Sequence, residues 1–187
     1  NPQSHVPLSI VCTSHKRPKQ TYFTIQSWNR VAKLHNTFFQ FVVVEDTLEP
    51  EHRLDPSLLS FSNIWVTYVF IQEHEKTWIN PCVNYNIGFS KAVGDIVVIT
   101  NAEVCVFGDV YQVIKDHITD SDYLVFDVME AGDVYNHCAT NLNDHLWLTY
   151  NNDFSYTNLF NVMKSHYHSF LQGRHLNRAY HFLTVLS

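Results

Sequence analysis

The sequence predicts an α/β fold: an open, mostly parallel, twisted sheet with helices on both faces. Three observations predict it. Short apolar runs rich in β-branched residues alternate with stretches of helical period over residues 8–128. Several runs are apolar at consecutive positions, as strands covered on both faces of a parallel sheet must be. Polar clusters follow these runs, where the ligand-binding loops of such sheets lie.

The first elements are predicted as strand, helix and strand. Leu8 to Cys12 is a short apolar run that indicates a buried strand feeding a polar loop. Residues 21–34 carry apolar side chains mostly three or four apart, which predicts an amphipathic helix, and Pro18 suits its first turn. Phe38 to Val44 carries apolar side chains on both faces and predicts a second buried strand.

The next two elements are predicted as strand and helix. Ile64 to Ile71 has partly alternating apolar residues and indicates a third strand. The Asn80-Pro81 pair resembles a helix cap followed by proline at the first helical position. We expect this helix to run to Val93 and to stop at Gly94, whose missing Cβ favours a left-handed C-cap.

The remaining elements complete the alternation. Asp95 to Thr100 is the most strand-like segment, and it is followed by a predicted helix over Gly108 to Ile118 and a strand over Tyr123 to Val128. Residues 131–152 are rich in Asn, Asp and His, which predicts a long loop. The expected closing elements are a helix around residues 156–164 and a strand around residues 180–186.

Composition limits the partners. The 187 residues fit one domain, and 12 Lys+Arg against 18 Asp+Glu give a net charge of -6 with no basic run, so nucleic-acid binding is not expected. No stretch approaches the length of a membrane span, and residues 1–5 lack signal-peptide character. Four scattered cysteines without a C-x-x-C pair favour a reducing compartment. We therefore expect a cytoplasmic protein, located in the host cytoplasm if the chain is viral.

Three polar clusters follow predicted strands. They are Thr13 to Arg17, Glu45 to Thr47, and Asn101 to Glu103. In an open α/β sheet, ligands bind outside the carboxyl ends of the strands, so the three clusters are expected to converge there. Each cluster alone could be an ordinary solvated loop, and the prediction of a ligand site depends on all three.

Four motifs occur in a fixed order between Leu8 and Val104. They are Ser-Ile-Val-Cys-Thr-Ser-His-Lys-Arg-Pro from Ser9, Val-Val-Val-Glu-Asp-Thr from Val42, Asn-Tyr-Asn-Ile-Gly from Asn84 with a later Ala-x-Gly-Asp, and Ile-Thr-Asn-Ala-Glu from Ile99. Together they resemble the family 2 glycosyltransferases of the GT-A (Rossmann-like) fold. The last motif is most similar to a virus and polysaccharide-locus branch with Asn-Pro-Glu where most relatives have Asp-x-Asp.

The resemblance implies one GT-A domain over residues 1–187, with a nucleotide-sugar-binding half (1–104) and an acceptor-side half (105–187). The loop after the first strand would hold the nucleotide, with Arg17 near the diphosphate. Glu45 or Asp46 would accept the imide N–H of the base, which favours a UDP-sugar because an ionised carboxylate only accepts hydrogen bonds. The implied nucleotide-sugar-binding residues are Thr13, Ser14, His15, Arg17, Glu45, Asp46, Asn84, Asn86, Asn101 and Ala102.

The resemblance also implies a divalent cation, Mn²⁺ or Mg²⁺, because the leaving group is a nucleoside diphosphate. Glu103 occupies the position of the metal-binding acid, and Asn101 stands in for the first Asp of the motif. Asn101 would contact the ribose or a metal-bound water. His181, or the pair His166 and His168, could add a ligand, although an isolated histidine is more often a surface or core residue.

This chain departs from the family pattern at two further positions. Thr13 replaces the usual proline, and Tyr85 stands where relatives have an arginine.

Trp78 and Trp147 could stack on a sugar or base, and core packing is the alternative.

The implied reaction is transfer of a hexosyl or pentosyl group to a glycan or other hydroxyl acceptor, with inversion. Inversion needs a general base, which in relatives follows the segment that matches residues 180–187, where this sequence stops. We therefore expect a truncated chain, a base supplied elsewhere, or an unusual base such as Asp144 or Asp153. The alternative function is a catalytically inactive nucleotide-sugar or glycan-binding domain of a larger protein.

Overall fold

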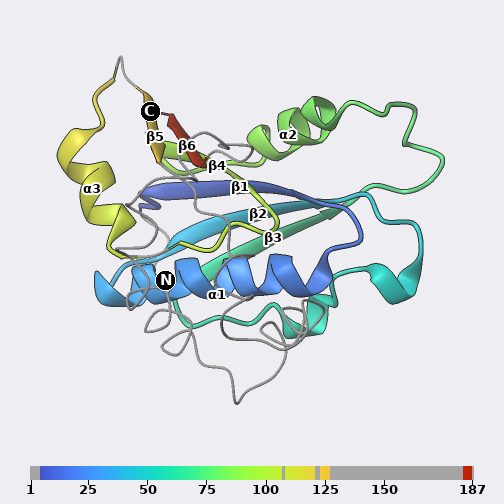
Figure 1. Ribbon diagram of the computed structural model, residues 1–187, viewed down its shortest axis with the longest axis horizontal. Coiled ribbons are helices and arrows are strands. Elements are labelled where there is room, and N and C mark those ends of the chain that lie inside the picture. Colours follow the sequence, from blue (N-terminus) through green and yellow to red (C-terminus); the bar gives the residue numbers. More distant parts are fainter. Residues whose placement is uncertain (1–4, 107, 121–122, 127–182, 187) are drawn as a thin grey trace, which may run out of the picture.

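A mixed β-sheet forms the centre of the fold (Figure 1). The computed structural model describes residues 5–106, 108–120, 123–126 and 183–186. The strands in this part of the chain are β1 (Leu8–Ser14), β2 (Phe39–Glu45), β3 (Ile64–Phe70), β4 (Ile96–Asn101), β5 (Tyr123–Phe126) and β6 (Leu183–Leu186).

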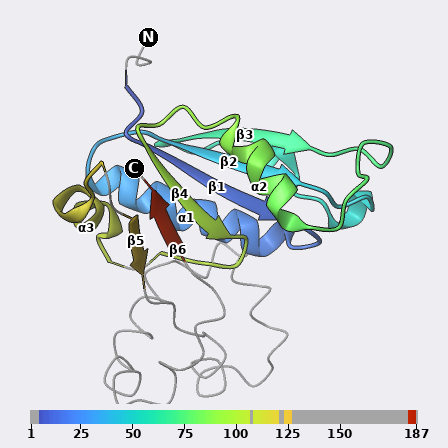
Figure 2. The ribbon, with the colours of Figure 1, turned by 90° about the horizontal axis from the view of Figure 1, so that it is seen from above.

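The strands lie in the order β3-β2-β1-β4-β6-β5 (Figure 2). β1 pairs in parallel with β2 and β4, and β2 pairs in parallel with β3. β6 is antiparallel to both β4 and β5. The predicted α/β class, with an open and mostly parallel sheet, is therefore confirmed.

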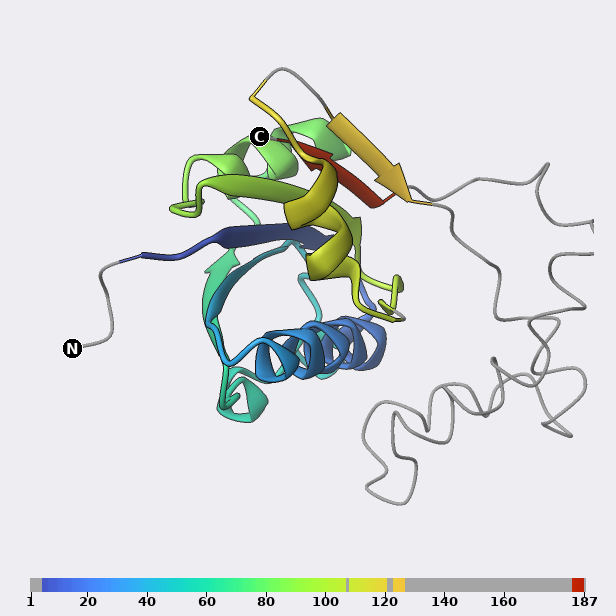
Figure 3. The ribbon, with the colours of Figure 1, turned by 90° about the vertical axis from the view of Figure 1, so that its left-hand side faces the viewer.

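Helices cover both faces of the sheet, as predicted. α1 (Pro18–Leu34) and α2 (Pro81–Phe89) lie on opposite sides of the strands (Figure 3). α3 (Val110–His117) packs on the same side as α1, where Tyr111 contacts Phe39 with ring centroids 4.9 Å apart. Two short 3-10 turns, η1 (Pro50–His52) and η2 (Pro56–Leu58), connect β2 to β3.

The two central strands are buried almost throughout. All seven residues of β2 and six of the seven in β1 are buried. On the α1 side they pack against Trp28 and Ile25 in the larger core cluster, and on the α2 side Val11 and Val44 form a smaller one. The consecutive apolar runs in the sequence reflect this burial on both faces.

Helix starts follow the local capping signals. α1 begins at Pro18, three residues before the predicted amphipathic stretch. The Asn80 side chain accepts a hydrogen bond from the Cys82 N–H at 2.9 Å, so the predicted cap of α2 is confirmed. α3 begins after Asp109, whose carboxylate accepts from the Gln112 N–H at 3.0 Å.

The predicted role of Gly94 is wrong. α2 ends at Phe89 rather than Val93, and among the described glycines only Gly108 has a positive φ. A Cβ at Gly94 would lie 2.5 Å from the Ser9 backbone nitrogen, and the Gly94 N–H donates to the Ser9 hydroxyl at 2.7 Å. Glycine is needed here because the chain passes directly against β1, not because a helix ends in a left-handed cap.

Several sequence predictions concern residues outside the described part of the chain. They are the loop at 131–152, the helix at 156–164 and the outer ends of the last two predicted strands. The division into two halves at residue 104 also stays a prediction. In the segments that the structure describes, no helix combines the length and the apolar character needed to cross a membrane.

Candidate functional site at the carboxyl edge of the sheet

The strand register brings the three polar clusters to one edge of the sheet. Thr13 of β1 is aligned with Asn101 of β4, and Ser14 is aligned with Glu45 of β2. The loops that carry His15, Asp46 and Glu103 therefore leave the sheet at the same edge. The predicted convergence of these clusters is confirmed.

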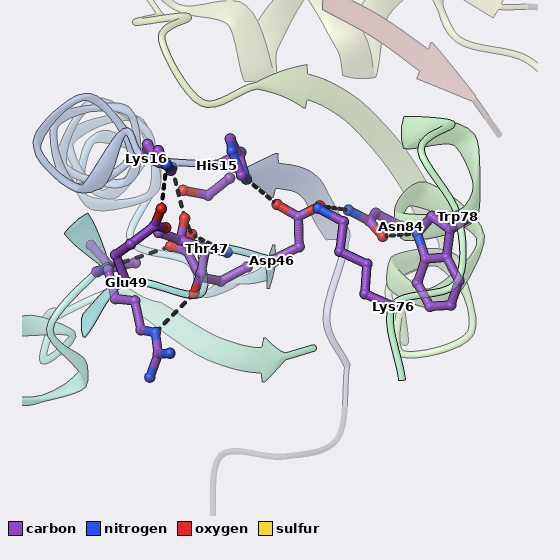
Figure 4. Close-up of polar contacts among 12 residues, drawn as sticks. His15, Lys16, Asp46, Thr47, Glu49, Lys76, Trp78 and Asn84 are labelled. Carbon is purple, nitrogen blue, oxygen red and sulfur yellow. Dashed lines mark hydrogen bonds and ion pairs between the residues drawn. The ribbon is translucent and has the colours of Figure 1, made fainter. Parts of the chain in front are cut away.

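Asp46 is the centre of a hydrogen-bonded group at this edge (Figure 4). Its Oδ1 lies 2.6 Å from His15 Nδ1, and its Oδ2 accepts from Asn84 Nδ2 at 3.0 Å. Lys76 Nζ lies 2.8 Å from the same Oδ2. Three donors from three different segments thus hold one carboxylate.

These donors keep Asp46 ionised. Burial by itself acts to raise the pKa of the carboxyl group, but the hydrogen bonds from Lys76, Asn84 and His15 outweigh it and lower the pKa below its ordinary value. Because an ionised carboxylate can only accept, His15 Nδ1 carries the proton in this contact. Only 10% of the Asp46 side chain is exposed, so solvent reaches a small part of this carboxylate.

Trp78 fixes the orientation of Asn84. The indole Nε1–H of Trp78 donates to Asn84 Oδ1 at 2.8 Å, so the Asn84 amide nitrogen is turned toward Asp46. Asn84 is buried, and both ends of its amide group are satisfied. Trp78 therefore has a polar role beside its packing against the smaller core cluster.

The structure separates Asn84 from Asn86. Asn86 is exposed, whereas Asn84 faces the sheet. Residues two apart on a helix do not share a face, so both side chains cannot reach one ligand from α2. Asn84 belongs to the group around Asp46, and Asn86 does not.

The structure also separates Glu45 from Asp46. Glu45 is completely buried, and its carboxylate accepts from the Thr47 hydroxyl, from the Thr47 N–H at 3.3 Å and from the Leu54 N–H at 3.4 Å. Burial raises the pKa of Glu45 although these contacts and the Ser14 hydroxyl lower it. Ser14 is itself buried and faces Glu45 rather than solvent.

Thr47 connects the loops that follow β1 and β2. Its hydroxyl oxygen accepts from the Lys16 N–H at 2.7 Å, and Lys16 has a left-handed backbone with φ 54°. The Lys16 ammonium lies 2.5 Å from Glu49 at the surface. Arg53 donates to the Thr47 carbonyl oxygen at 2.8 Å and contacts the face of Phe70.

On the β4 side, Arg17 pairs with Glu103. Arg17 Nη1 lies 2.5 Å from Glu103 Oε1, and these side chains are 50% and 27% exposed. Asn101 Oδ1 lies 3.0 Å from the Tyr85 hydroxyl, which also lies 3.1 Å from the Thr100 carbonyl oxygen. Burial, with smaller contributions from nearby acidic groups, raises the pKa of Tyr85 to about 12, so its hydroxyl stays protonated and donates. A hydrogen bond from Thr13 also reaches this hydroxyl and opposes the increase.

The donor set at the end of β4 fits one kind of metal site. Glu103 and Asn101 offer a carboxylate and an amide oxygen, as hard cations such as Mg²⁺ prefer. Among the described residues, no group of three or more His, Cys, Asp or Glu side chains could hold an ion by itself. An ion held by Glu103 and Asn101 would therefore need further ligands from water or phosphate oxygens, as Mg²⁺ commonly takes.

Of the other predicted site residues, one lies in the core and the rest lie outside the residues that the structure describes. Ala102 is buried in the core, and its carbonyl oxygen accepts from the Thr24 hydroxyl at 2.7 Å. Lys76 also belongs to the site through its contact with Asp46, but no sequence motif around it predicts this role. The predicted candidates that lie outside the described residues are Asp144, Trp147, Asp153, His166, His168 and His181.

Comparison with known proteins gives matches among solved structures only. No protein-family model matches the chain, and no curated protein matches it. The chain is similar to the crystal structure of S. aureus TarS 1-349, with 17% sequence identity and a TM-score of 0.44. The match covers 59% of this chain and 31% of that chain, so it spans about a third of the other structure. The open sheet with four parallel strands and helices on both faces is consistent with a Rossmann-like GT-A fold.

Proposed function

We propose that this chain is a metal-dependent glycosyltransferase domain that uses a nucleotide sugar, with a UDP-sugar as the favoured donor. The observation that carries the proposal is the meeting of an ionised Asp46, a cationic Arg17 and the Glu103 carboxylate at one edge of the sheet. Ligands of open α/β sheets bind at this edge. In this proposal Asp46 would accept from the base, Arg17 would bind the diphosphate, and Glu103 would bind the divalent cation.

Asp46 is the proposed acceptor for the base. An ionised carboxylate has about four lone-pair positions, and three donors occupy three of them here. One position is left for the imide N–H of a uracil-type base. Glu45, the other candidate from the sequence, is assigned no contact with the donor because it is completely buried and already hydrogen-bonded.

Arg17 is the proposed diphosphate ligand. Its planar guanidinium group can bind two phosphate oxygens at once, and half of its side chain is exposed. In the described structure this guanidinium neutralises Glu103, so in the proposed complex Arg17 would exchange the carboxylate for the diphosphate. Lys76 adds a positive charge at the same edge.

Glu103 and Asn101 would hold the divalent cation, Mn²⁺ or Mg²⁺. When bound, such a cation neutralises the negative charge that develops on the departing diphosphate. The Tyr85 hydroxyl, 3.0 Å from Asn101 Oδ1, would help to orient this amide oxygen. Asp144 and Asp153 stay candidate general bases for an inverting attack by the acceptor hydroxyl.

Calorimetric titration of the chain with UDP, with and without Mn²⁺, tests this proposal. We expect binding that strengthens when Mn²⁺ is present and that loses this dependence in Glu103→Gln. Asp95→Asn is the matched control, because Asp95 is an exposed carboxylate that pairs with His5 at the start of β4. Absence of metal-dependent binding to the unaltered chain would refute the proposal.

A nucleotide-sugar-binding domain without catalytic activity is the second candidate function. The end of β4 supplies one carboxylate, with Asn101 at the position of the second, and that carboxylate is neutralised by Arg17. Slow hydrolysis of a UDP-sugar, followed by NMR, separates the two candidates. An enzyme is expected to release UDP over hours, whereas a pure binding domain leaves the donor intact.

A further inference from the structure

We propose that Glu45 and Thr47 form a positioning relay that holds the two nucleotide-facing loops in register, with Glu45 as its buried anchor. The inference rests on the proposed nucleotide function and assigns a role to an acidic residue that does not contact the ligand. The loops in question are residues 15–17 after β1 and residues 46–54 after β2.

The anchor is the Glu45 carboxylate. It receives the Thr47 hydroxyl and two backbone N–H groups, one at each end of the 47–54 segment. Both ends of this segment are thereby tied to the last residue of β2. A buried carboxylate is costly unless its oxygens are hydrogen-bonded, and an apolar side chain could make none of these contacts.

The direction of the relay follows from the donors available. The Lys16 N–H can only donate, so the Thr47 oxygen must accept in their 2.7 Å contact. The single hydroxyl hydrogen of Thr47 is then used in the contact with the Glu45 carboxylate. The relay therefore runs from Lys16 N–H through Thr47 to Glu45.

The relay acts at a strained point of the β1 loop. Lys16 has φ 54°, a region that side-chain-bearing residues seldom adopt without support. The hydrogen bond to Thr47 provides such support. Lys16 stands between His15, which contacts Asp46, and Arg17, which contacts Glu103, so its backbone conformation sets where both neighbours point.

The test compares Thr47→Val, which removes the hydroxyl with little change of shape, with Thr47→Ser, which keeps it. Two measurements are made on each: hydrogen exchange of the Lys16 amide by NMR, and UDP affinity by calorimetry. In Thr47→Val we expect at least tenfold faster exchange and about tenfold weaker UDP binding, the loss expected for a hydrogen bond to a charged group. Thr47→Ser is expected to stay close to the unaltered chain in both.

Three further variants serve as controls for the test. Thr67→Val is the matched control, because the Thr67 hydroxyl on β3 accepts from Gln40 on β2, and the change should leave Lys16 exchange and UDP binding unchanged. Glu45→Gln keeps an acceptor for the Thr47 hydroxyl and is expected to retain slow Lys16 exchange. Glu45→Ala removes that acceptor, and the Lys16 amide is then expected to exchange quickly.

Unchanged Lys16 exchange or unchanged UDP affinity in a folded Thr47→Val variant overturns the relay, as does loss of both in Thr47→Ser. If Thr47→Val does not fold, fast Lys16 exchange in Glu45→Gln overturns it instead. Failure of the unaltered chain to bind UDP would refute the proposed function, whereas the Lys16 measurements need no nucleotide and test the relay independently.

Discussion

The two sides of the candidate site hold their carboxylates in different ways. Asp46 is 10% exposed and is bound by three donors that come from the β1 loop, the 71–80 loop and α2. Glu103 is 27% exposed, and its described ion pair is with Arg17, a flexible side chain that is 50% exposed. The comparison separates a preorganised side, proposed here for the base, from an exchangeable side, proposed for the diphosphate and cation. Ion pairs that solvent reaches contribute little stability, and the Arg17–Glu103 pair is partly exposed, so exchange at Glu103 should cost little.

Asp46→Ala should give the largest effect. The change leaves Lys76 and Asn84 without their shared acceptor and removes the proposed contact with the base. We expect stability to fall by about 1–3 kcal/mol, as when buried polar partners are left unsatisfied, and UDP affinity to fall at least tenfold. Urea unfolding and calorimetry measure the two losses, and a variant as stable as the unaltered chain would contradict the preorganised side.

Glu103→Gln should separate binding from stability. We expect stability within about 0.5 kcal/mol of the unaltered chain, because the pair with Arg17 is partly exposed to solvent. The Mn²⁺-dependent part of UDP binding should disappear. A large loss of stability, measured by urea unfolding, would mean that this side is as rigidly built as the other.

Arg17→Ala should give an intermediate loss on the exchangeable side. The variant frees the Glu103 carboxylate from its cation and removes the proposed diphosphate ligand. We expect UDP affinity to fall about tenfold, as for loss of a charge-assisted hydrogen bond, while Mn²⁺ alone binds at least as well as before. Weaker Mn²⁺ binding, detected by electron paramagnetic resonance, would contradict competition between Arg17 and the cation.

Acidification should remove the contribution of Asp46 to stability. The folded-state pKa of Asp46 is lowered, so its contribution to stability is complete above the unfolded-state pKa of about 3.9 and is lost as the pH falls through the folded-state pKa. The raised pKa of its neighbour Glu45 has the opposite sign, because its burial costs stability as the pH rises from the unfolded-state value through the folded-state one. Urea unfolding from pH 2.5 to 7 should show a smaller acid-induced loss in Asp46→Ala, and an unchanged loss would contradict this assignment.

Asn86→Ala should give the smallest effect. Asn86 is exposed on α2, and Asn84 alone reaches Asp46. We expect UDP affinity to change less than twofold, below about 0.4 kcal/mol. A tenfold loss would mean that the ligand contacts the outer face of α2.

The sequence predicted the elements well where the signal was local. Apolar runs located β1 to β4 within one or two residues at most ends, and the Asn80-Pro81 pair located the start of α2. The Gly94 prediction was wrong because the reason for glycine there is a contact with Ser9, 85 residues away in sequence, which no local pattern records.

The sequence predicted where on the sheet the site lies, but not which side chains contact one another there. Sheet topology alone indicates that the three clusters converge, whereas which of Glu45 and Asp46 turns toward solvent depends on Thr47 and Leu54. The helical period of α2 could have excluded a shared role for Asn84 and Asn86. Lys76 lies in a loop without any regular pattern, so only its position beside Asp46 identifies it.

The strand order has a consequence for how the chain can be shortened. Within the described residues, β5 joins the sheet through β6, and β6 in turn pairs with β4. A piece of this chain that ended before Leu183 would lose β6 and would also detach β5 from its hydrogen-bonding neighbour. The backbone edge of β4 would then be uncovered, and unpaired strand edges of this kind promote self-association. Expression fragments designed to isolate the nucleotide-facing portion should therefore retain the final strand.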